Sequence, residues 1–423
     1  MEKKDNIKTL DPSNISCGLD FGTSNSVISV TDLSTGEELF TSSLQSILYF
    51  PASDAELCYV GKEAEEKYVE EQMKGRLLKS VKTLLKQDKF LFTWINGKKI
   101  TPDRMASYII RKLKDSAEAF LGFEIEKVIL GRPAIFSEKE EEETTAVKRL
   151  LTAAYNAGFK EVHLQLEPIA AAFSYEQRLT RESLVLVADF GGGTSDFSIV
   201  RLSPEKLHVK DRSNDILAHG GLYLGGDMFD SEIMWHKVTS LLGRGVKYKS
   251  YDKYIEVPNT LYRELRNWER SFLLKDSSAR RMLDKYYVFS DYNSHINNAM
   301  QLIDNNYVYS LFKEIERSKI ALSEHPVTEL CFQNQHMAIR ESITFGEYEE
   351  VINSHVSRIK EYIETMMEES GYECSSIDSV YLTGGSSLSK PIKNVFNDMF
   401  GAERVHCGDT FHSVAHGLSL TRI

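Results

Sequence analysis

The chain has 423 residues, 42% apolar and 27% charged, and its 51 basic and 62 acidic residues give a net charge of −11. This composition excludes a collagen-like chain, a disordered tail protein and a disulfide-rich miniprotein. The length predicts several packed units, each with its own core. The acidic balance argues against nucleic acid as a partner, because such binding needs a basic face.

The sequence shows no sign of a targeting signal or a membrane span. Its first residues are polar. The longest apolar stretch near any motif, residues 184–188, is far shorter than the roughly 20 residues that a span requires. The five cysteines are scattered and form no CxxC pair, which indicates reduced thiols. We therefore expect a cytoplasmic protein without a membrane span, and a monomer is the simplest state.

A repeated turn motif is the strongest internal signal. Residues 17–30 and 187–200 share the order Asp-Phe-Gly-Thr-Ser-Asn/Asp once two glycines are removed from the second copy. Each copy predicts a strand, a tight glycine turn and a second strand. The equivalent Asp20 and Asp189 lie 169 residues apart, which is too far for a solenoid repeat. The spacing suits two duplicated lobes.

Between the two copies, strands and helices are expected to alternate. A stripe of leucines around Val81 predicts a helix over residues 77–85. Pro168 suits the first turn of a helix. Alternation of this kind indicates α/β sheets flanked by helices. The other expected elements are a helix over 105–121, a strand over 128–130, a helix over 138–158, a strand over 161–166 and a helix over 169–179.

Residues 248–309 differ in composition from the rest of the chain. They hold nine of the 20 tyrosines and no glycine. We expect a helical subdomain inserted in the second lobe. Aromatic enrichment can mark a contact surface, or the subdomain can pack its own rings, and the sequence leaves both open.

The two turns carry the residue types that bind phosphate. Their glycines let backbone N–H groups approach a phosphate that a Cβ would keep away, and Thr23 and Thr194 can add hydroxyl donors. Asp20 and Asp189 would repel a phosphate unless a cation lay between. Mg²⁺ fits, because it keeps most of its waters and needs only one or two carboxylates. The doubled motif therefore predicts a magnesium-linked phosphate site.

Five ordered motifs resemble the ATPase domain of the seventy-kilodalton heat-shock (DnaK-type) chaperones, in the actin and sugar-kinase superfamily. Besides the two turns they are Leu-Glu-Pro-Ile-Ala-Ala-Ala at 166–172, Leu-Gly-Gly-Asp-Met-Phe-Asp at 224–230 and Tyr-Leu-Thr-Gly-Gly-Ser-Ser at 381–387. The resemblance covers residue 15 to about residue 420. It implies an actin-like (ribonuclease H-like) α/β fold of two lobes around a central nucleotide cleft.

The resemblance also implies a domain organisation. Residues 1–14 would be an N-terminal extension. The first lobe would span 15–184, with an inserted subdomain at about 50–120, and the second lobe would span 185–423, with an insertion at about 231–310.

The ligand implied by the resemblance is ATP or ADP with Mg²⁺, with K⁺ as a second candidate ion. Lys82 aligns with the catalytic lysine at the γ-phosphate, and Lys79 is its competitor. Glu167 would position the attacking water, or would only cap the helix at Pro168. The implied catalytic residues are Lys82, Glu167, Asp189 and Thr194, and the implied metal site is Asp20, Asp189 and Asp196. The implied nucleotide-binding residues are Gly22, Thr23, Ser24, Asn25, Gly191, Gly192, Gly193, Thr194, Gly225, Gly226, Glu316, Lys319, Ile320, Ser323, Gly384, Gly385, Ser386 and Leu388.

Two departures from the family pattern matter. Ile320 and Leu388 stand where the family usually has the arginines that sandwich adenine, so we expect an apolar sandwich, and base selectivity stays open. No peptide-binding domain follows the last helix, so we expect a shortened form in which ATP binding is better supported than protein refolding.

Three function classes remain on the sequence alone. The first is a nucleotide-driven switch with slow ATP hydrolysis that acts through a protein partner, which the sequence does not identify. The second is an ATP-dependent filament protein, and the third is a metabolite kinase of the same superfamily. The helix over 316–323 and the turn at 224–227 favour the first.

Overall fold

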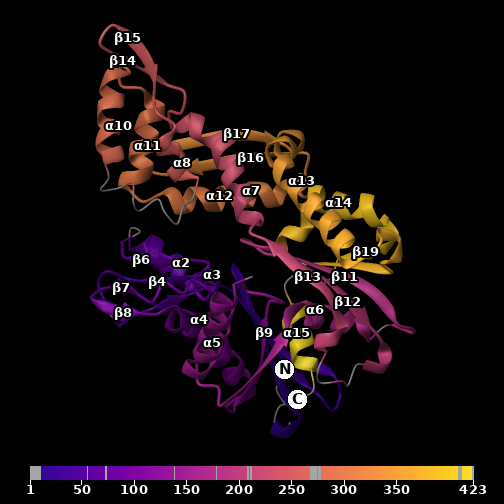
Figure 1. The fold of residues 1–423 in the computed structure, drawn as a ribbon. Helices are drawn as coiled ribbons and strands as arrows, with labels where there is room; N and C mark the ends of the chain where they lie inside the picture. The colour runs from indigo at the N-terminus through magenta and orange to yellow at the C-terminus, as the bar shows by residue number, and fades with distance from the viewer. Residues whose placement is uncertain are drawn as a thin grey trace.

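The computed structural model describes residues 11–54, 56–71, 74–137, 139–177, 179–206, 209, 212–266, 274, 278–407 and 412–421. Most of the expected N-terminal extension lies outside these residues. The described part forms two lobes (Figure 1). Short 3₁₀ turns lie at Pro12–Asn14, Pro204–Lys206, Ser213–Asp215, Cys374–Ser376, Gly385–Leu388 and Ala402–Arg404.

The first lobe is built on a five-stranded sheet in the order β10–β9–β1–β2–β3. Three strands form an antiparallel meander, and two more pair in parallel on the other side of β1. The strands are β1 (Ile15–Phe21), β2 (Asn25–Asp32), β3 (Glu37–Gln45), β9 (Lys127–Arg132) and β10 (Glu161–Leu166). Helix α4 (Pro102–Leu121) packs on β2 and β3, and α5 (Glu140–Asn156) packs on α4 and β10.

The second lobe repeats this plan with a sheet in the order β13–β12–β11–β18–β19. Again three antiparallel strands are followed by two parallel ones. The strands are β11 (Ser183–Phe190), β12 (Ser195–Leu202), β13 (Ile216–Leu222), β18 (Ser379–Thr383) and β19 (Val405–Cys407). Helix α13 (Phe345–Ser370) packs on β13, and α14 (Lys390–Phe400) packs on β19. The predicted strand–turn–strand repeat is confirmed, and each copy opens one sheet.

Two helices lie between the sheets and join the lobes. They are α6 (Glu167–Glu176) and α15 (Ser413–Leu420), which pack against each other (Figure 1). They cross closely, since a Cβ on Gly417 would lie 2.7 Å from the carbonyl carbon of Ala170. Helix α15 also packs against β1 and β2 of the first sheet. The lobe boundaries drawn from the sequence stay predictions.

The insertion in the first lobe corrects one expected helix. Leu77 and Leu78 lie in a strand, where they pair with Tyr49 and Leu48, and Ser80 has a φ of +59°. The helix begins only after this break, because sheet pairing overrides the helical periodicity of a short apolar run. The elements are β4 (Leu48–Phe50), β5 (Tyr59–Val60), α2 (Lys62–Glu70), β6 (Arg76–Leu78), α3 (Val81–Leu84), β7 (Thr93–Ile95) and β8 (Lys98–Ile100).

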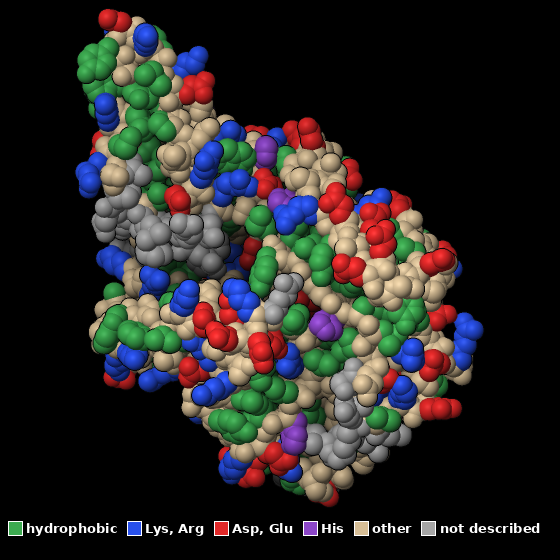
Figure 2. All heavy atoms as spheres, in the orientation of Figure 1, with side chains coloured by type: hydrophobic (Ala, Val, Ile, Leu, Met, Phe, Trp, Pro, Cys, Tyr) green, Lys and Arg blue, Asp and Glu red, His purple; other side chains and the backbone are tan. Residues whose placement is uncertain are grey.

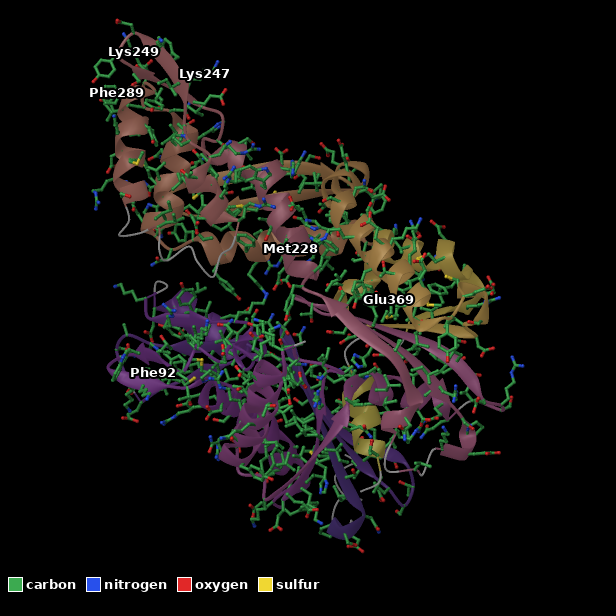
Figure 3. All side chains as sticks on the ribbon, in the orientation of Figure 1. Phe92, Met228, Lys247, Lys249, Phe289 and Glu369 are labelled. Atoms are coloured by element: carbon green, nitrogen blue, oxygen red, sulfur yellow. The ribbon has the colours of Figure 1, made fainter. Side chains whose placement is uncertain are left out.

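The insertion in the second lobe is mainly helical and ends in a hairpin. Tyr262 and Tyr286 are buried in it, whereas Tyr251, Tyr254 and Tyr292 are exposed, so its aromatics serve both the core and the surface. Hydrophobic side chains gather at the outer end of this arm (Figure 2), where Lys247, Lys249 and Phe289 also lie (Figure 3). The elements are β14 (Lys247–Ser250), β15 (Lys253–Glu256), α8 (Thr260–Leu265), α10 (Ser278–Phe289) and α11 (Ser294–Asp304).

The remaining elements connect this arm to the second sheet. Helix α7 (Gly226–Ile233) leads into a π-helical turn (Met234–Val238) and a 3₁₀ turn (Thr239–Leu242). Helix α12 (Val308–Leu322) packs on α7 and on the hairpin of β16 (Val327–Gln333) and β17 (Ala338–Thr344). Among the described residues, no helix is both long enough and apolar enough to cross a bilayer. All five cysteines are free thiols, as expected.

Candidate functional site

A cavity of about 520 Å³ lies between the lobes and is lined by most of the predicted site residues. Those on its wall are Asp20, Gly22, Thr23, Ser24, Asn25, Lys82, Glu167, Asp189, Gly191, Gly192, Thr194, Asp196, Gly226, Glu316, Lys319, Ile320, Ser323, Gly384, Gly385, Ser386 and Leu388. Gly193 instead lines a smaller adjoining cavity of about 250 Å³. Gly225 lies against the carbonyl groups of the second glycine turn.

The two glycine turns meet at the base of this cavity. The turn between β1 and β2 touches the turn between β11 and β12, because a Cβ on Gly192 would collide with Ser24 Oγ. The methyl group of Thr23 lies 3.5 Å from the position of a Cβ on Gly193. The Ser24 hydroxyl is enclosed and has no hydrogen-bond partner within the described structure. An enclosed hydroxyl beside two glycine turns suits a phosphate oxygen.

Three aspartates from the two sheets share the base of the cavity. Asp189 faces Asp196 across the β11–β12 pair. Enclosure in the cleft, followed by the charges of Asp20 and Asp196, raises the pKa of Asp189 to about 8. Enclosure and the charge of Glu167 raise the pKa of Asp20 to about 7. Enclosure raises the pKa of Asp196 to about 6, although Lys82 opposes the shift. Crowded acids of this kind are stabilised by a cation.

Lys82 and Glu167 form an ion pair in the wall of the same cavity. Lys82 Nζ donates to Glu167 Oε1 at 2.8 Å, and both side chains are largely buried, at 14% and 10% exposed. Burial lowers the pKa of Lys82, but the charges of Glu167 and Asp20 outweigh burial and raise it, so the lysine stays charged. Lys82 comes from α3, and Glu167 opens α6 just before Pro168. The pair therefore places a cation and a carboxylate beside the aspartates.

Lys79, the competitor of Lys82, lies at a different place. Its Nζ donates to Asp227 Oδ1 of the second lobe at 3.2 Å. It lines the smaller cavity together with Ser80, whereas Lys82 lines the larger one. Lys79 thus links the lobes. This contact could not be predicted from the sequence, because the partner is 148 residues away.

The start of α7 closes the cavity from the second lobe. The backbone N–H groups of Gly226 and Asp227 donate to the carbonyls of Gly191 and Gly192 at 3.1 and 2.8 Å. Lys319 Nζ donates to the Gly226 carbonyl at 3.0 Å and pairs with Asp230 at 2.9 Å. The turn over 224–227 therefore holds the second glycine turn in position.

The other end of the cavity has two exposed aliphatic side chains among polar ones. Ile320 on α12 is 61% exposed, and Leu388, in the 3₁₀ turn Gly385–Leu388, is 50% exposed, although both line the cavity. Ser323 and Glu324 follow on from α12 along the same wall. Glu316 pairs with Lys313 at 3.2 Å. Glu324, Tyr348 and Ser389 also line this cavity. The sequence analysis did not name these three: Glu324 directly follows the predicted Ser323, whereas tertiary packing brings Tyr348 and Ser389 to this wall.

The acidic side chains of the cavity limit the kind of metal ion that can bind there. In the part of the chain that the structure describes, no group of three or more His, Cys, Asp or Glu side chains is arranged to bind a metal directly. An ion held only by protein ligands does not fit. Mg²⁺ bound mainly through water and phosphate oxygens does fit, because it needs only one or two carboxylates and Asp20 and Asp189 supply them.

Comparison with known proteins identifies the family. The model of the family described as "Hsp70 protein" matches residues 58–251 and 286–421. The mitochondrial-type heat shock protein 70 of Encephalitozoon hellem is 25% identical over 98% of this chain and 64% of its own length. Chaperone protein DnaK of Thermosipho melanesiensis is 26% identical over 91% of this chain and 55% of its own length.

A plant relative, the mitochondrial heat shock 70 kDa protein of Pisum sativum, is 24% identical over 77% of this chain and 40% of its own length. The chain therefore spans between 40% and 64% of these relatives. The two matched segments cover most of the chain and include both the second glycine turn and the Gly-Gly-Ser turn within residues 381–387. With its duplicated sheets and central cavity, the chain belongs to the Hsp70 family and has the actin-like, two-lobed fold of its ATPase domain.

Proposed function

We propose that the protein binds ATP or ADP with Mg²⁺, hydrolyses ATP slowly and uses the bound nucleotide to set the closure of its two lobes. One observation carries this proposal: two matching glycine turns, one from each lobe, meet in a single cavity with an aspartate behind each turn. A ligand held by both turns favours the closed arrangement, because it contacts groups that separate when the lobes part.

Different residues of the cavity would bind the phosphates and the metal ion. The N–H groups of the glycine turns and the hydroxyls of Thr23 and Ser24 would hold the phosphates, whereas the Thr194 hydroxyl donates its proton to Asp196. Asp20 and Asp189 would hold Mg²⁺ through its waters, with Asp196 behind them, and K⁺ is a second candidate ion here. The metal would supply charge neutralisation on the phosphates, which phosphoryl transfer needs more than covalent chemistry.

The Lys82–Glu167 pair supplies the chemistry from the protein side. Glu167 has one oxygen 2.8 Å from Lys82 Nζ, which leaves its other oxygen able to accept a hydrogen bond from a water. Lys82 would place positive charge where negative charge shifts during transfer. Thr194 Oγ1 donates to Asp196 Oδ2 at 3.0 Å, which fixes the hydroxyl at the second turn. These roles support hydrolysis by a positioned water.

Removing the metal should therefore remove the activity. We expect Asp189→Asn to lower ATP hydrolysis about 10–100-fold, the usual cost of losing a group that orients a metal through its waters, and EDTA to lower it further. The measurement is phosphate release at saturating ATP. Asp252→Asn, in the exposed loop between β14 and β15, is the matched control and should leave hydrolysis unchanged. Full activity in EDTA and in Asp189→Asn would rule out this phosphate site.

Membership of the Hsp70 family favours neither a filament protein nor a metabolite kinase. We propose that the switch acts on or through a protein partner and that the protein itself is a monomer. Light scattering with and without ATP tests the second point. We retain the cytoplasm as the proposed compartment, although two of the relatives above carry mitochondrial names.

A further inference from the structure

A cation–π contact joins the two lobes from outside the cavity. Lys86 follows α3 in the first lobe, and Tyr223 lies between β13 and α7 in the second, 137 residues further along the chain. Lys86 Nζ lies 3.7 Å from the centroid of the Tyr223 ring and donates to the Tyr223 hydroxyl. Neither side chain lines the cavity. The Tyr223 side chain is exposed and Lys86 is half-buried, so the contact connects the lobes at the surface.

On the first-lobe side, Lys86 belongs to a segment that is fixed to α5. The Arg149 guanidinium, on α5, donates at 2.9–3.1 Å to four backbone carbonyls of this segment, those of Leu84, Leu85, Gln87 and Phe90. Lys82 lies only four residues before Lys86, in α3. A force on Lys86 is therefore transmitted to a short, braced segment that carries Lys82.

On the second-lobe side, Tyr223 leads directly into the turn that holds the second glycine turn. The Leu224 carbonyl accepts a hydrogen bond from Ser195 Oγ at 2.6 Å. The next N–H groups, of Gly226 and Asp227, donate to carbonyls of the second glycine turn. The position of Tyr223 is therefore linked to that of the N–H groups in the second glycine turn.

The Lys86 end of the segment lies near the acids at the base of the cavity. Burial lowers the pKa of Lys86, and the charge of Asp196 opposes this shift. Lys79, seven residues earlier, pairs with Asp227 and lines the smaller cavity. Both ends of the segment thus contact the second lobe, with Lys82 between them. Only the Lys86 contact combines a link across the lobes with an interaction with one of the three aspartates.

We infer that Lys86 and Tyr223 are positioning residues for ATP hydrolysis, because their contact sets the distance between Lys82 and the second glycine turn. The inference rests on the proposed function, since it concerns the alignment of the same site. Misplacement of reacting groups by about 1 Å can slow a reaction ~10²-fold. The groups proposed to hold the phosphates and the metal are separate from this contact, so losing it should slow hydrolysis more than it weakens ATP binding.

The test measures single-turnover ATP hydrolysis with Mg²⁺, beside equilibrium ATP binding, in Lys86→Ala, Tyr223→Ala and the double variant. We expect each single variant to hydrolyse ATP about tenfold more slowly, equivalent to about 1.4 kcal/mol, as for a partly desolvated cation–π contact. ATP affinity should stay within about threefold of that of the unmodified protein. The double variant should also be about tenfold slower, because both changes remove the same contact. Tyr223→Phe keeps the ring and should restore most of the rate.

Lys99→Ala is the matched control. Lys99 Nζ lies 4.0 Å from the centroid of the Phe92 ring, and both residues belong to the insertion in the first lobe, so this variant loses the same kind of contact without separating the lobes. Its hydrolysis should equal that of the unmodified protein.

Three results would overturn the inference and leave the proposed function standing. They are normal hydrolysis in Lys86→Ala or Tyr223→Ala, a double variant about a hundredfold slower than the unmodified protein, and a loss of ATP affinity as large as the loss of rate. Retained ATP binding also shows that a slow variant is folded. If the unmodified protein neither binds nor hydrolyses ATP, the proposed function fails and the inference fails with it.

Discussion

Lys82→Ala should bind ATP within about tenfold of the unmodified protein, a difference of about 1.4 kcal/mol, yet hydrolyse it about 10²–10³-fold more slowly. Binding is largely kept because the glycine turns and the metal hold the phosphates independently of the lysine. Hydrolysis suffers because the variant loses positive charge at the transferring phosphate and leaves Glu167 without its partner at 2.8 Å. Single-turnover phosphate release, measured beside equilibrium binding, separates the two effects.

Lys79→Ala is the informative comparison for this result. It removes the link to Asp227 across the lobes but leaves the Lys82–Glu167 pair intact. We expect its single-turnover hydrolysis to stay close to that of the unmodified protein, with faster release of bound nucleotide. If the Lys79→Ala variant hydrolysed ATP slowly and the Lys82→Ala variant kept full activity, Lys79 would be the catalytic lysine. Normal rates in both would indicate a protein that binds nucleotide without using either lysine.

Gly225→Ala should lower hydrolysis about 10²-fold, although residue 225 does not line the cavity. A Cβ there would lie 2.7 Å from the Gly191 carbonyl oxygen and closer still to the carbonyl of Gly192. Both neighbours are backbone atoms of the second glycine turn, so that turn has to move. Displacement by about 1 Å is enough to cost this much when a site depends on alignment.

The matched control is Gly346→Ala, at an exposed position with no atom within 4 Å of the added Cβ. Steady-state hydrolysis and ATP affinity are measured for both variants, with thermal unfolding as a check on the fold. An active Gly225→Ala protein would mean that the second turn is free to shift, and the contact between the turns would then have no role in catalysis.

The fold was predictable because one short pattern occurs twice. The aspartate and glycines of each hairpin are adjacent in the sequence, so a local motif was enough to place both turns, and the duplicated sheets followed from it. Pro168 similarly fixed the start of α6. Short sequence motifs were therefore enough to predict the parts of the site that are formed by backbone turns.

Contacts between distant segments could not be predicted in this way. The periodicity around Val81 predicted a continuous helix, but pairing of Leu77 and Leu78 with β4 ends the helical stretch. That break separates Lys79 from Lys82, so the two lysines face different cavities. The exposure of Ile320 and Leu388 likewise depends on how α12 and the turn Gly385–Leu388 pack in the folded chain, and neighbouring residues in the sequence do not determine this packing.

The close packing of α15 on the first sheet has a consequence for the newly made chain. Thr31 Oγ1 and Ser419 Oγ lie 2.7 Å apart although 388 residues separate them, and a Cβ on Gly18 would lie 2.7 Å from Leu418 Cβ. At about 5–20 residues per second, a ribosome needs roughly 20–80 s to make the intervening chain. During that interval the face of β1 and β2 that α15 covers stays exposed, although the core of the first lobe itself contains no residue of this helix. Aggregation of this protein should therefore depend on the speed of translation.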